Sequence, residues 1–239
     1  MEGFILAAGL GTRLRPLTDD RPKALVEIPL TPSGSSPESR EQHSVTLLEI
    51  AIRRLEEAGI RHIVVNVHHF ADKVIDFIDS HTWQAKIDIS DERDLLLDTG
   101  GGLRHATPLF HGNEDILIHN VDILSDIDIQ DVESHHKSHG NLVTLCVSRR
   151  QTKRLLAFDH NGLLVGRAEE GLAFSGISVV SPRLFPLLPV DDHPYPVIDE
   201  YIRLSHEGHR IGCYEHNPDH WLDVGKPETL ALATKFYNP

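Results

Sequence analysis

Residues 4–23, FILAAGLGTRLRPLTDDRPK, join an apolar run to a glycine turn and a cluster of positive charge. The apolar run stops at Gly9, which predicts a short strand buried on both faces and therefore a parallel sheet. Gly9 and Gly11 have no Cβ, so backbone N–H groups in this turn can approach a ligand closely. Four cations follow within eleven residues: Arg13, Arg15, Arg21 and Lys23. In a chain of formal net charge -13, this local positive charge predicts a phosphate-binding loop.

Two familiar glycine-loop motifs do not fit this turn. A dinucleotide-binding GxGxxG would need a third glycine where the chain has Leu14, which weakens a nicotinamide oxidoreductase reading. A Walker loop would need Gly-Lys-Ser or Gly-Lys-Thr, and neither tripeptide occurs in the chain. The remaining alternative is a tight turn from strand to loop with solvated arginines.

The chain of 239 residues fits one large α/β domain spanning residues 1–239. No apolar run approaches the ~20 residues of a membrane span, and the start Met1-Glu2 lacks a basic signal-peptide region, so we expect a cytoplasmic protein without a membrane partner. The acidic balance argues against a nucleic-acid partner but is compatible with small anionic substrates. Cys146 and Cys213 lie in apolar contexts and are predicted to be reduced core thiols.

Apolar periodicity predicts an alternation of strands and helices. Strands are expected at 4–8, 60–67, 86–90, 115–120, 142–148, 172–180 and 211–215, and helices at 47–58, 71–80 and 197–206, before 142, and from Pro227 onward. This order predicts a Rossmann-like, mostly parallel central sheet flanked by helices, with a ligand crevice at the carboxyl ends of the strands. Gly9, Asn66 and Asn120 are expected at such ends. A Pro- and Ser-rich insertion loop interrupts the pattern at about 30–45, without periodicity.

The motif G-L-G-T-R-L-x-P-x-T, followed by Pro22-Lys23, resembles the signature of the sugar-1-phosphate nucleotidylyltransferases. Four later segments occur in the order of that family's base, metal, sugar and second metal motifs: LDTGGG at 97–102, NVD at 120–122, FSGI at 174–177 and WLDVG at 221–225. The resemblance extends from residue 4 to about residue 230. It is strongest to compact uridylyltransferases that act on N-acetylmuramate 1-phosphate.

The resemblance implies a Mg²⁺-dependent enzyme that makes an NDP-sugar and pyrophosphate from an NTP, with UTP favoured, and a sugar 1-phosphate. Mannose-1-phosphate guanylyltransferase and phosphocholine cytidylyltransferase are alternatives with the same chemistry. A catalytically silent nucleotide-sugar-binding regulatory protein is an alternative of another class. Such a protein would be expected to lack part of the set Arg13, Lys23, Asp122 and Asp223, all of which are present.

Site residues follow from the resemblance. Arg13 and Lys23 are expected to be catalytic, and Asp122 and Asp223 to bind Mg²⁺ through oxygen ligands. The nucleotide-binding residues are predicted to be Ala8, Gly9, Gly11, Thr12, Arg13, Thr99, Gly100 and Asn120. The residues predicted to bind the sugar phosphate are Lys23, Ser175, Gly176 and Glu170.

Some of these segments also have simpler explanations or depart from the family pattern. Thr99 would serve as the N-cap of a helix carrying Leu103 and Ala106. The glycines at 100–102 would then be the flexible first residues of that helix. Val121 stands where the family commonly has glycine, and a β-branched residue disfavours positive φ. The glutamate-lysine-proline that usually precedes the sugar motif is missing.

The chain also has seventeen histidines. His135 and His139 have a spacing that zinc sites use, but no cysteine or carboxylate motif accompanies them, so a solvated helix face is favoured.

Overall fold

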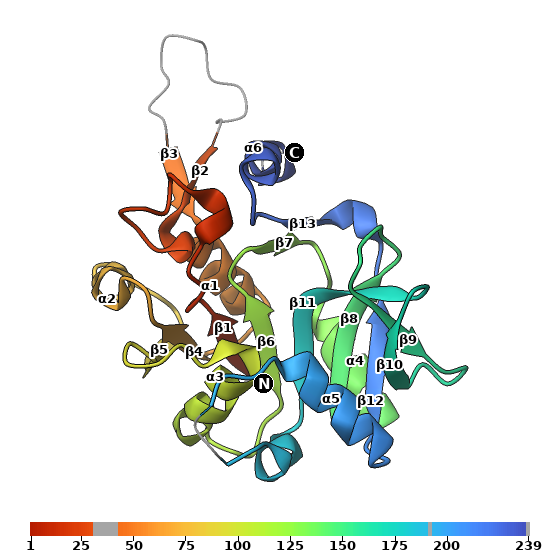
Figure 1. Cartoon of the computed structure of the whole chain (residues 1–239). Coiled ribbons are helices and arrows are strands. Elements are labelled where there is room, and N and C mark those ends of the chain that lie inside the picture. Colours follow the sequence, from red (N-terminus) through yellow and green to blue (C-terminus); the bar gives the residue numbers. More distant parts are fainter. Residues whose placement is uncertain (31–42, 191–192, 238–239) are drawn as a thin grey trace.

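The computed structural model describes residues 1–30, 43–190 and 193–237, so most of the predicted insertion loop, residues 31–42, lies outside the described residues. A nine-stranded sheet runs through the molecule in the order β10-β9-β11-β6-β1-β4-β5, and β8 pairs with both β11 and β12. Figure 1 shows this sheet with helices packed around it. The bounds of these strands are β1 Glu2–Leu6, β4 His62–Val67, β5 Lys86–Asp91, β6 Ile116–Asn120, β8 Val143–Ser148, β9 Leu155–Phe158, β10 Leu164–Ala168, β11 Leu172–Val180 and β12 Ile211–Glu215.

The centre of the sheet is parallel, as the alternation of elements predicts. β1 pairs in parallel with both β4 and β6, β4 pairs in parallel with β5, and β8 with β12. β11 runs antiparallel to β6 and β8 and so joins the two parallel parts. β9 and β10, which lie at one end of the sheet, form an antiparallel pair. The α/β fold with a mostly parallel central sheet is confirmed, and the antiparallel strands lie on the side of β11.

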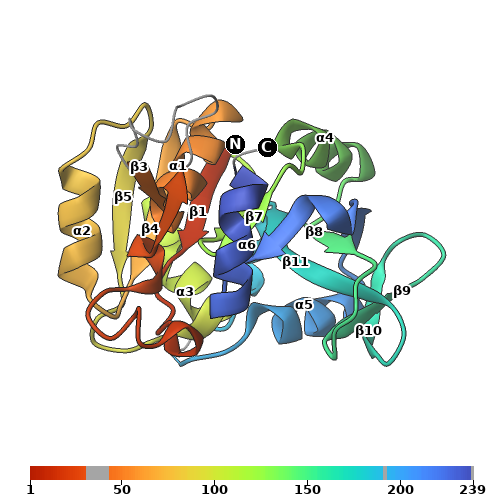
Figure 2. The same ribbon diagram turned by 90° about the horizontal axis from the view of Figure 1, so that it is seen from above.

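Helices cover both faces of the sheet, and each face has its own apolar core (Figure 2). Alternate residues of one strand belong to different cores, because successive strand side chains point to opposite faces. In β1, Ile5 belongs to the core that includes residues of α1, α2 and α4, whereas Phe4 belongs to the core that includes residues of α3 and α5. The helix bounds are α1 Leu47–Glu57, α2 Ala71–Asp79, α3 Asp98–Ala106, α4 Ile129–His139, α5 Val197–His206 and α6 Pro227–Tyr237.

Two short strand pairs lie outside the main sheet. β2 (Glu27–Leu30) pairs with β3 (His43–Thr46), so the prediction of an insertion loop at about 30–45 is wrong at its two ends, which form strands. β7 (Ile123–Ser125) pairs with β13 (Trp221–Asp223), two strands that are about a hundred residues apart in the chain. Neither pair has a strong local pattern, because each strand has only three or four residues.

Local details complete the description of the fold. Thr46 caps α1, and its hydroxyl accepts a hydrogen bond from the backbone N of Glu49 at 3.1 Å. Cys146 and Cys213 are free thiols, and burial raises the pKa of both. Among the described residues, no helix is both long enough and apolar enough to span a membrane.

Candidate active site

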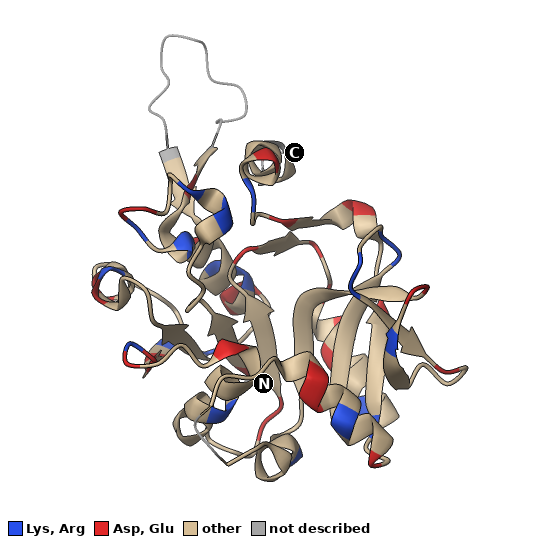
Figure 3. Ribbon diagram, in the orientation of Figure 1, with Lys and Arg blue, Asp and Glu red and all other residues tan. Residues whose placement is uncertain are grey.

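A pocket of about 560 Å³ opens at the carboxyl ends of β1, β4 and β6, where a parallel sheet is expected to bind its ligand. Its wall includes Leu6, Asn66 and Asn120, from the ends of these three strands. The loops that follow β1 carry a group of Lys and Arg segments beside this edge (Figure 3). The predicted site residues that line the pocket are Ala8, Gly9, Gly11, Thr12, Arg13, Lys23, Thr99, Asn120 and Asp122.

The strand before the glycine loop ends two residues earlier than its apolar run predicts. β1 ends at Leu6, and the backbone N–H groups of Ala7 and Ala8 donate to the Asn66 side-chain oxygen at 2.7 and 3.2 Å. The Asn66 amide in turn donates to Glu92 at 2.8 Å, which fixes its orientation. The sequence placed Asn66 at a strand end but did not indicate that it binds the loop after β1. The available signal was an amide side chain directly after buried β-branched residues.

Gly11 is required by the shape of the loop. Its φ of 65° is left-handed, and an added Cβ would lie 3.0 Å from Thr18 and 3.2 Å from Lys23. The Thr18 hydroxyl donates to the Gly11 carbonyl at 2.8 Å and fastens the turn. A Cβ at Gly9 would meet nothing within 4 Å, so the backbone there stays open toward the pocket. The short helix η1 (Thr12–Leu14) then carries Arg13.

Lys23 and Asp122 form an ion pair across the pocket floor. Lys23 begins the short helix η2 (Lys23–Leu25), and its side chain is only 11% exposed, against 16% for Asp122. An ion pair this buried holds both side chains in place more firmly than a solvated pair would. The pair therefore joins the loop after β1 to the end of β6.

The strand pair β7–β13 brings the two predicted metal-binding carboxylates together. Asp223 lies opposite Ile123, and the backbone N of Val224 donates to the Asp122 carbonyl at 2.8 Å. Burial and the neighbouring Asp122 carboxylate raise the pKa of Asp223, while the charges of Lys23 and Arg13 act in the opposite direction. These four side chains, from three segments that are about a hundred residues apart, therefore share one electrostatic site.

Gly225 makes room for two members of this group. A Cβ added there would lie 2.6 Å from the Asp223 Oδ1 atom and 2.7 Å from an Arg13 Nη2 atom. Arg13 and Asp223 thus approach each other over a position where a larger residue would displace one of them. Sequence reasoning quoted Gly225 as part of a motif but did not assign it a site role.

The carboxylates fit a hard divalent cation. The Oδ1 atom of Asp223 is buried and has no hydrogen-bond partner, which leaves a carboxyl oxygen free beside the Asp122 carboxylate. Paired carboxylate oxygens, with phosphates and water completing the coordination shell, suit Mg²⁺. Val121, the departure from the family pattern, is buried and is not among the described non-glycine residues with positive φ, so its side chain strains no turn.

The glycine-rich segment that begins α3 is crowded by the protein itself. The Gly100 N–H donates to the Tyr195 carbonyl at 2.9 Å, and an added Cβ would lie 2.2 Å from the Tyr195 ring. Thr99 is not the predicted N-cap, because α3 starts at Asp98 and the Thr99 hydroxyl accepts a hydrogen bond from Val197 at 2.9 Å. The nucleotide-binding role of Gly100 stays a prediction, and the structure adds a packing reason for the glycine.

The residues predicted to bind the sugar lie outside the pocket that the predicted phosphate-binding residues line. Ser175 is fully buried, and its hydroxyl is hydrogen-bonded to Arg150 at 2.9 Å and to His216 at 2.7 Å. Gly176, with φ of 74°, lies against Asn120, while Glu170 is exposed between β10 and β11. None of the three lines the pocket described above, and their role stays a prediction.

Arg150 was missed by sequence reasoning. Its guanidinium lies 3.9 Å from the centre of the Trp221 ring. Burial lowers the pKa of Arg150, and the charge of Asp223 acts in the opposite direction. By contrast, two cations of the first motif are surface residues. Arg15 and Arg21 are largely exposed and pair with neighbouring aspartates at 3.4 and 3.0 Å.

The chain matches the nucleotidyl transferase family model over residues 2–158, and it belongs to this family, as a sugar-1-phosphate nucleotidylyltransferase. An N-acetylmuramate alpha-1-phosphate uridylyltransferase of Caulobacter vibrioides is 30% identical over 96% of this chain and 94% of its own length. The catalytic subunit beta of a mannose-1-phosphate guanylyltransferase of Dictyostelium discoideum is 24% identical over 99% of this chain, which spans 64% of that protein.

A solved structure confirms the fold. The crystal structure of HddC from Yersinia pseudotuberculosis, complexed with GMP-PN, superimposes with a TM-score of 0.77 over 99% of both chains. At 22% identity this likeness concerns the fold alone.

Proposed function

We propose that the protein transfers the uridylyl group of UTP to N-acetylmuramate 1-phosphate, with Mg²⁺, and releases pyrophosphate. Sugar-1-phosphate nucleotidyltransferase chemistry follows from the family. The choice of UTP and N-acetylmuramate 1-phosphate is supported by the relative that is 30% identical over nearly the whole chain. The proposal keeps the cytoplasmic location predicted from the sequence.

The reaction needs no nucleophile from the protein. A phosphate oxygen of the sugar phosphate attacks the α-phosphorus of UTP, forming a new P–O bond, while the bond from the α-phosphorus to the bridging oxygen breaks. Pyrophosphate leaves with the electron pair of that bond. Because both substrates are anions, the protein contributes alignment and charge neutralisation.

Each charged residue has a place in this scheme. Arg13 and the backbone N–H groups near Gly11 and Thr12 bind the β- and γ-phosphates, which become the leaving group. Lys23, held beside Asp122, faces the reacting phosphates. Asp122 and Asp223 hold Mg²⁺, which when bound neutralises negative charge on the phosphates.

The proposal assigns the nucleoside and the sugar to different segments. Thr99 and Asn120 line the pocket on the side of β6 and α3, where the proposal places the nucleoside. Ser175, Gly176 and Glu170 would contact the sugar, and the contact of Gly176 with Asn120 ties that segment to the pocket wall.

The observation that carries the proposal is the convergence of Arg13, Lys23, Asp122 and Asp223 on one site. The test is a pyrophosphate-release screen of four NTPs against a panel of sugar 1-phosphates, with Mg²⁺ present. We expect the highest kcat/KM for UTP with N-acetylmuramate 1-phosphate. A higher value for GTP with mannose 1-phosphate would instead support the chemistry named in the Dictyostelium discoideum relative.

A further inference from the structure

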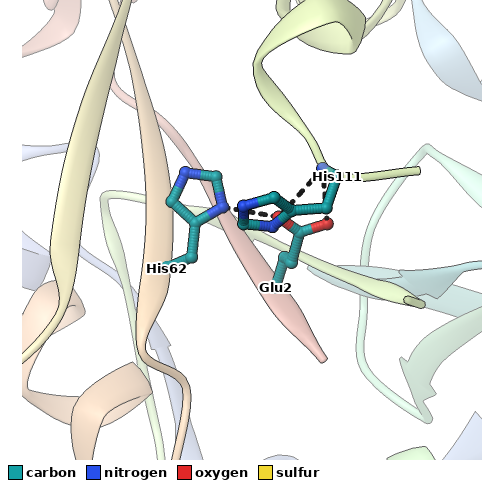
Figure 4. A group of neighbouring side chains, drawn as sticks. All are labelled: Glu2, His62 and His111. Atoms are coloured by element: carbon teal, nitrogen blue, oxygen red, sulfur yellow. Dashed lines mark hydrogen bonds and ion pairs between the residues drawn. The ribbon is translucent and has the colours of Figure 1, made fainter. Parts of the chain in front are cut away.

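A second cluster of metal-binding side chains lies at the amino ends of the parallel strands, opposite the active site. Glu2 begins β1, His62 begins β4, and His111 follows the short helix η3 (Thr107–Leu109). Glu2 is buried, with a side chain only 2% exposed, whereas the His111 side chain is 63% exposed. Figure 4 shows the interactions of both histidines converging on the Glu2 carboxylate.

The two imidazole rings compete for one oxygen. The Nδ1 atoms of His62 and His111 lie 2.5 and 2.7 Å from the same Oε1 atom of Glu2, and the ring centres are 4.7 Å apart. The other Glu2 oxygen accepts a hydrogen bond from the His111 backbone N at 3.1 Å, which fixes the carboxylate. Three potential ligand atoms therefore lie within 4.8 Å of one another.

His62 has more carboxylate neighbours than a neutral ring can satisfy. Its Nε2 atom lies 2.9 Å from Asp88 Oδ2, while its Nδ1 atom faces Glu2. A neutral imidazole carries a single N–H, so one of the two contacts would place a lone pair against a carboxylate oxygen. A cation at Nδ1 removes this conflict, and that cation is either a proton or a metal ion.

We propose that Glu2, His62 and His111 bind a divalent transition metal, with Zn²⁺ as the best-suited ion. Two imidazole nitrogens and one carboxylate oxygen form a donor set that zinc uses, with water as a fourth ligand. His62 then donates its Nε2 proton to Asp88, the arrangement in which metal-binding histidines are usually held. A metal ion also avoids placing two positively charged rings side by side.

The ligand atoms need only a small adjustment. Tetrahedral ligands at about 2.0 Å from zinc are separated by roughly 3.3 Å, somewhat more than the present contacts. The exposed His111 ring can move by this amount and also gives the ion a path from solvent. The 2.5 Å contact between the buried His62 and Glu2 side chains must also lengthen, by roughly 0.8 Å. The bound ion would link the starts of β1 and β4 to the segment after η3, so we expect it to stabilise the fold without taking part in nucleotidyl transfer.

Zinc binding can be measured on the full chain by equilibrium dialysis, with excess Mg²⁺ present to occupy the active-site carboxylates. We expect one tightly bound Zn²⁺ and an increase in the thermal unfolding midpoint. His111→Ala, at an exposed position, should weaken binding by about 100-fold or more, and Asp88→Asn by about 10- to 100-fold. The matched control His139→Ala removes an exposed histidine of α4 and should leave binding unchanged.

Two further measurements make the assignment specific. Asp223→Asn should retain the Zn²⁺, whereas loss of the ion in that variant would place it in the active site and overturn the proposal. Co²⁺ should give the strong visible absorption of a tetrahedral complex, and this should disappear in His111→Ala. Equal Zn²⁺ binding by the wild type and His111→Ala would show that the cluster holds protons only. Circular dichroism checks that each variant is folded.

Discussion

The two ends of β1 carry different chemistry on the same strand. At its carboxyl end, a glycine loop and two cations adjoin a pair of carboxylates, and one carboxylate oxygen has no partner. At its amino end, Glu2 is packed between two imidazole rings. Several strands end side by side at each edge of a parallel sheet, so the fold alone does not determine which ligand binds there. Oxygen donors beside cations suit a metal-bound triphosphate, whereas nitrogen donors suit a softer metal ion.

The largest difference between the two ends should appear when a carboxylate is neutralised. Asp122→Asn and Asp223→Asn should each lower kcat for pyrophosphate release by about 10³-fold or more, because charge neutralisation at the reacting phosphates is lost. The unfolding midpoint of Asp223→Asn should change little, since Asp223 Oδ1 makes no hydrogen bond that could be lost. Asp122→Asn should also lower the midpoint, because it removes the charge that pairs with the buried Lys23. Asp88→Asn, at the opposite edge, is the matched control and should retain full activity. Full activity in either active-site variant would contradict the metal assignment.

Removing a cation at the carboxyl end of β1 should cause the next largest loss of activity. Arg13→Ala and Lys23→Ala should each reduce turnover by about 10²- to 10³-fold, or roughly 3–4 kcal/mol of transition-state stabilisation. Steady-state kinetics of pyrophosphate release measures this effect. Arg15→Ala removes an exposed cation of the same loop and should behave as the wild type. An equal loss in that control would mean that net charge, and not position, matters.

His119 lies in the middle of the sheet and, unlike His62 and His111 at its edge, has no hydrogen-bonding partner for its ring. We expect this difference to make the stability of the protein depend on pH. His119 is fully buried, and neither of its ring nitrogens has a hydrogen-bond partner. Burial, and next the charge of Arg54, lower its pKa to about 4. Because the unfolded chain then binds more protons, stability should fall as the pH falls from about 6.5 toward 4, by about 3 kcal/mol in total.

Urea unfolding at several pH values measures this loss. His119→Leu should lose less stability than the wild type between pH 6.5 and pH 4, because the group that must gain a proton is absent. Parallel curves for the two proteins would show that His119 titrates normally in the folded state.

The smallest effect concerns space at the active-site end. Gly225→Ala would push the new Cβ against Asp223 and Arg13, and we expect a loss of roughly tenfold in kcat/KM, about 1.4 kcal/mol. Gly166→Ala in β10 is the control, because its Cβ would meet nothing within 4 Å. Unchanged kinetics in Gly225→Ala would show that the two side chains can separate without cost.

Local patterns predicted the long elements, and some with their bounds. β11, α5 and β12 begin and end where their periodicity predicts, because each has a continuous apolar pattern and a clear stop. The short strands β7 and β13 could not be found this way, since their stability comes from pairing across about a hundred residues. The meeting of Asp122 with Asp223 depends on that pair, so it was available to sequence reasoning only through family resemblance.

Side-chain partners were the least predictable part of the site. The hydrogen bonds of Asn66 to two loop amides, and of Thr99 to Val197, join segments that no periodicity relates. Gly100 illustrates the same limit, because its lack of a side chain is explained by a ring nearly a hundred residues later. Residue types indicated a phosphate site, whereas the tertiary fold determined which groups are free to bind.

The central claim is that Asp122 and Asp223 act on one ion in one triphosphate site. The most direct measurement is pyrophosphate release by Asp122→Asn, Asp223→Asn and the double variant, compared with the wild type. If both carboxylates hold the same ion, the double variant should be no slower than the slower single variant. Losses that multiply in the double variant would show two independent roles and contradict the claim.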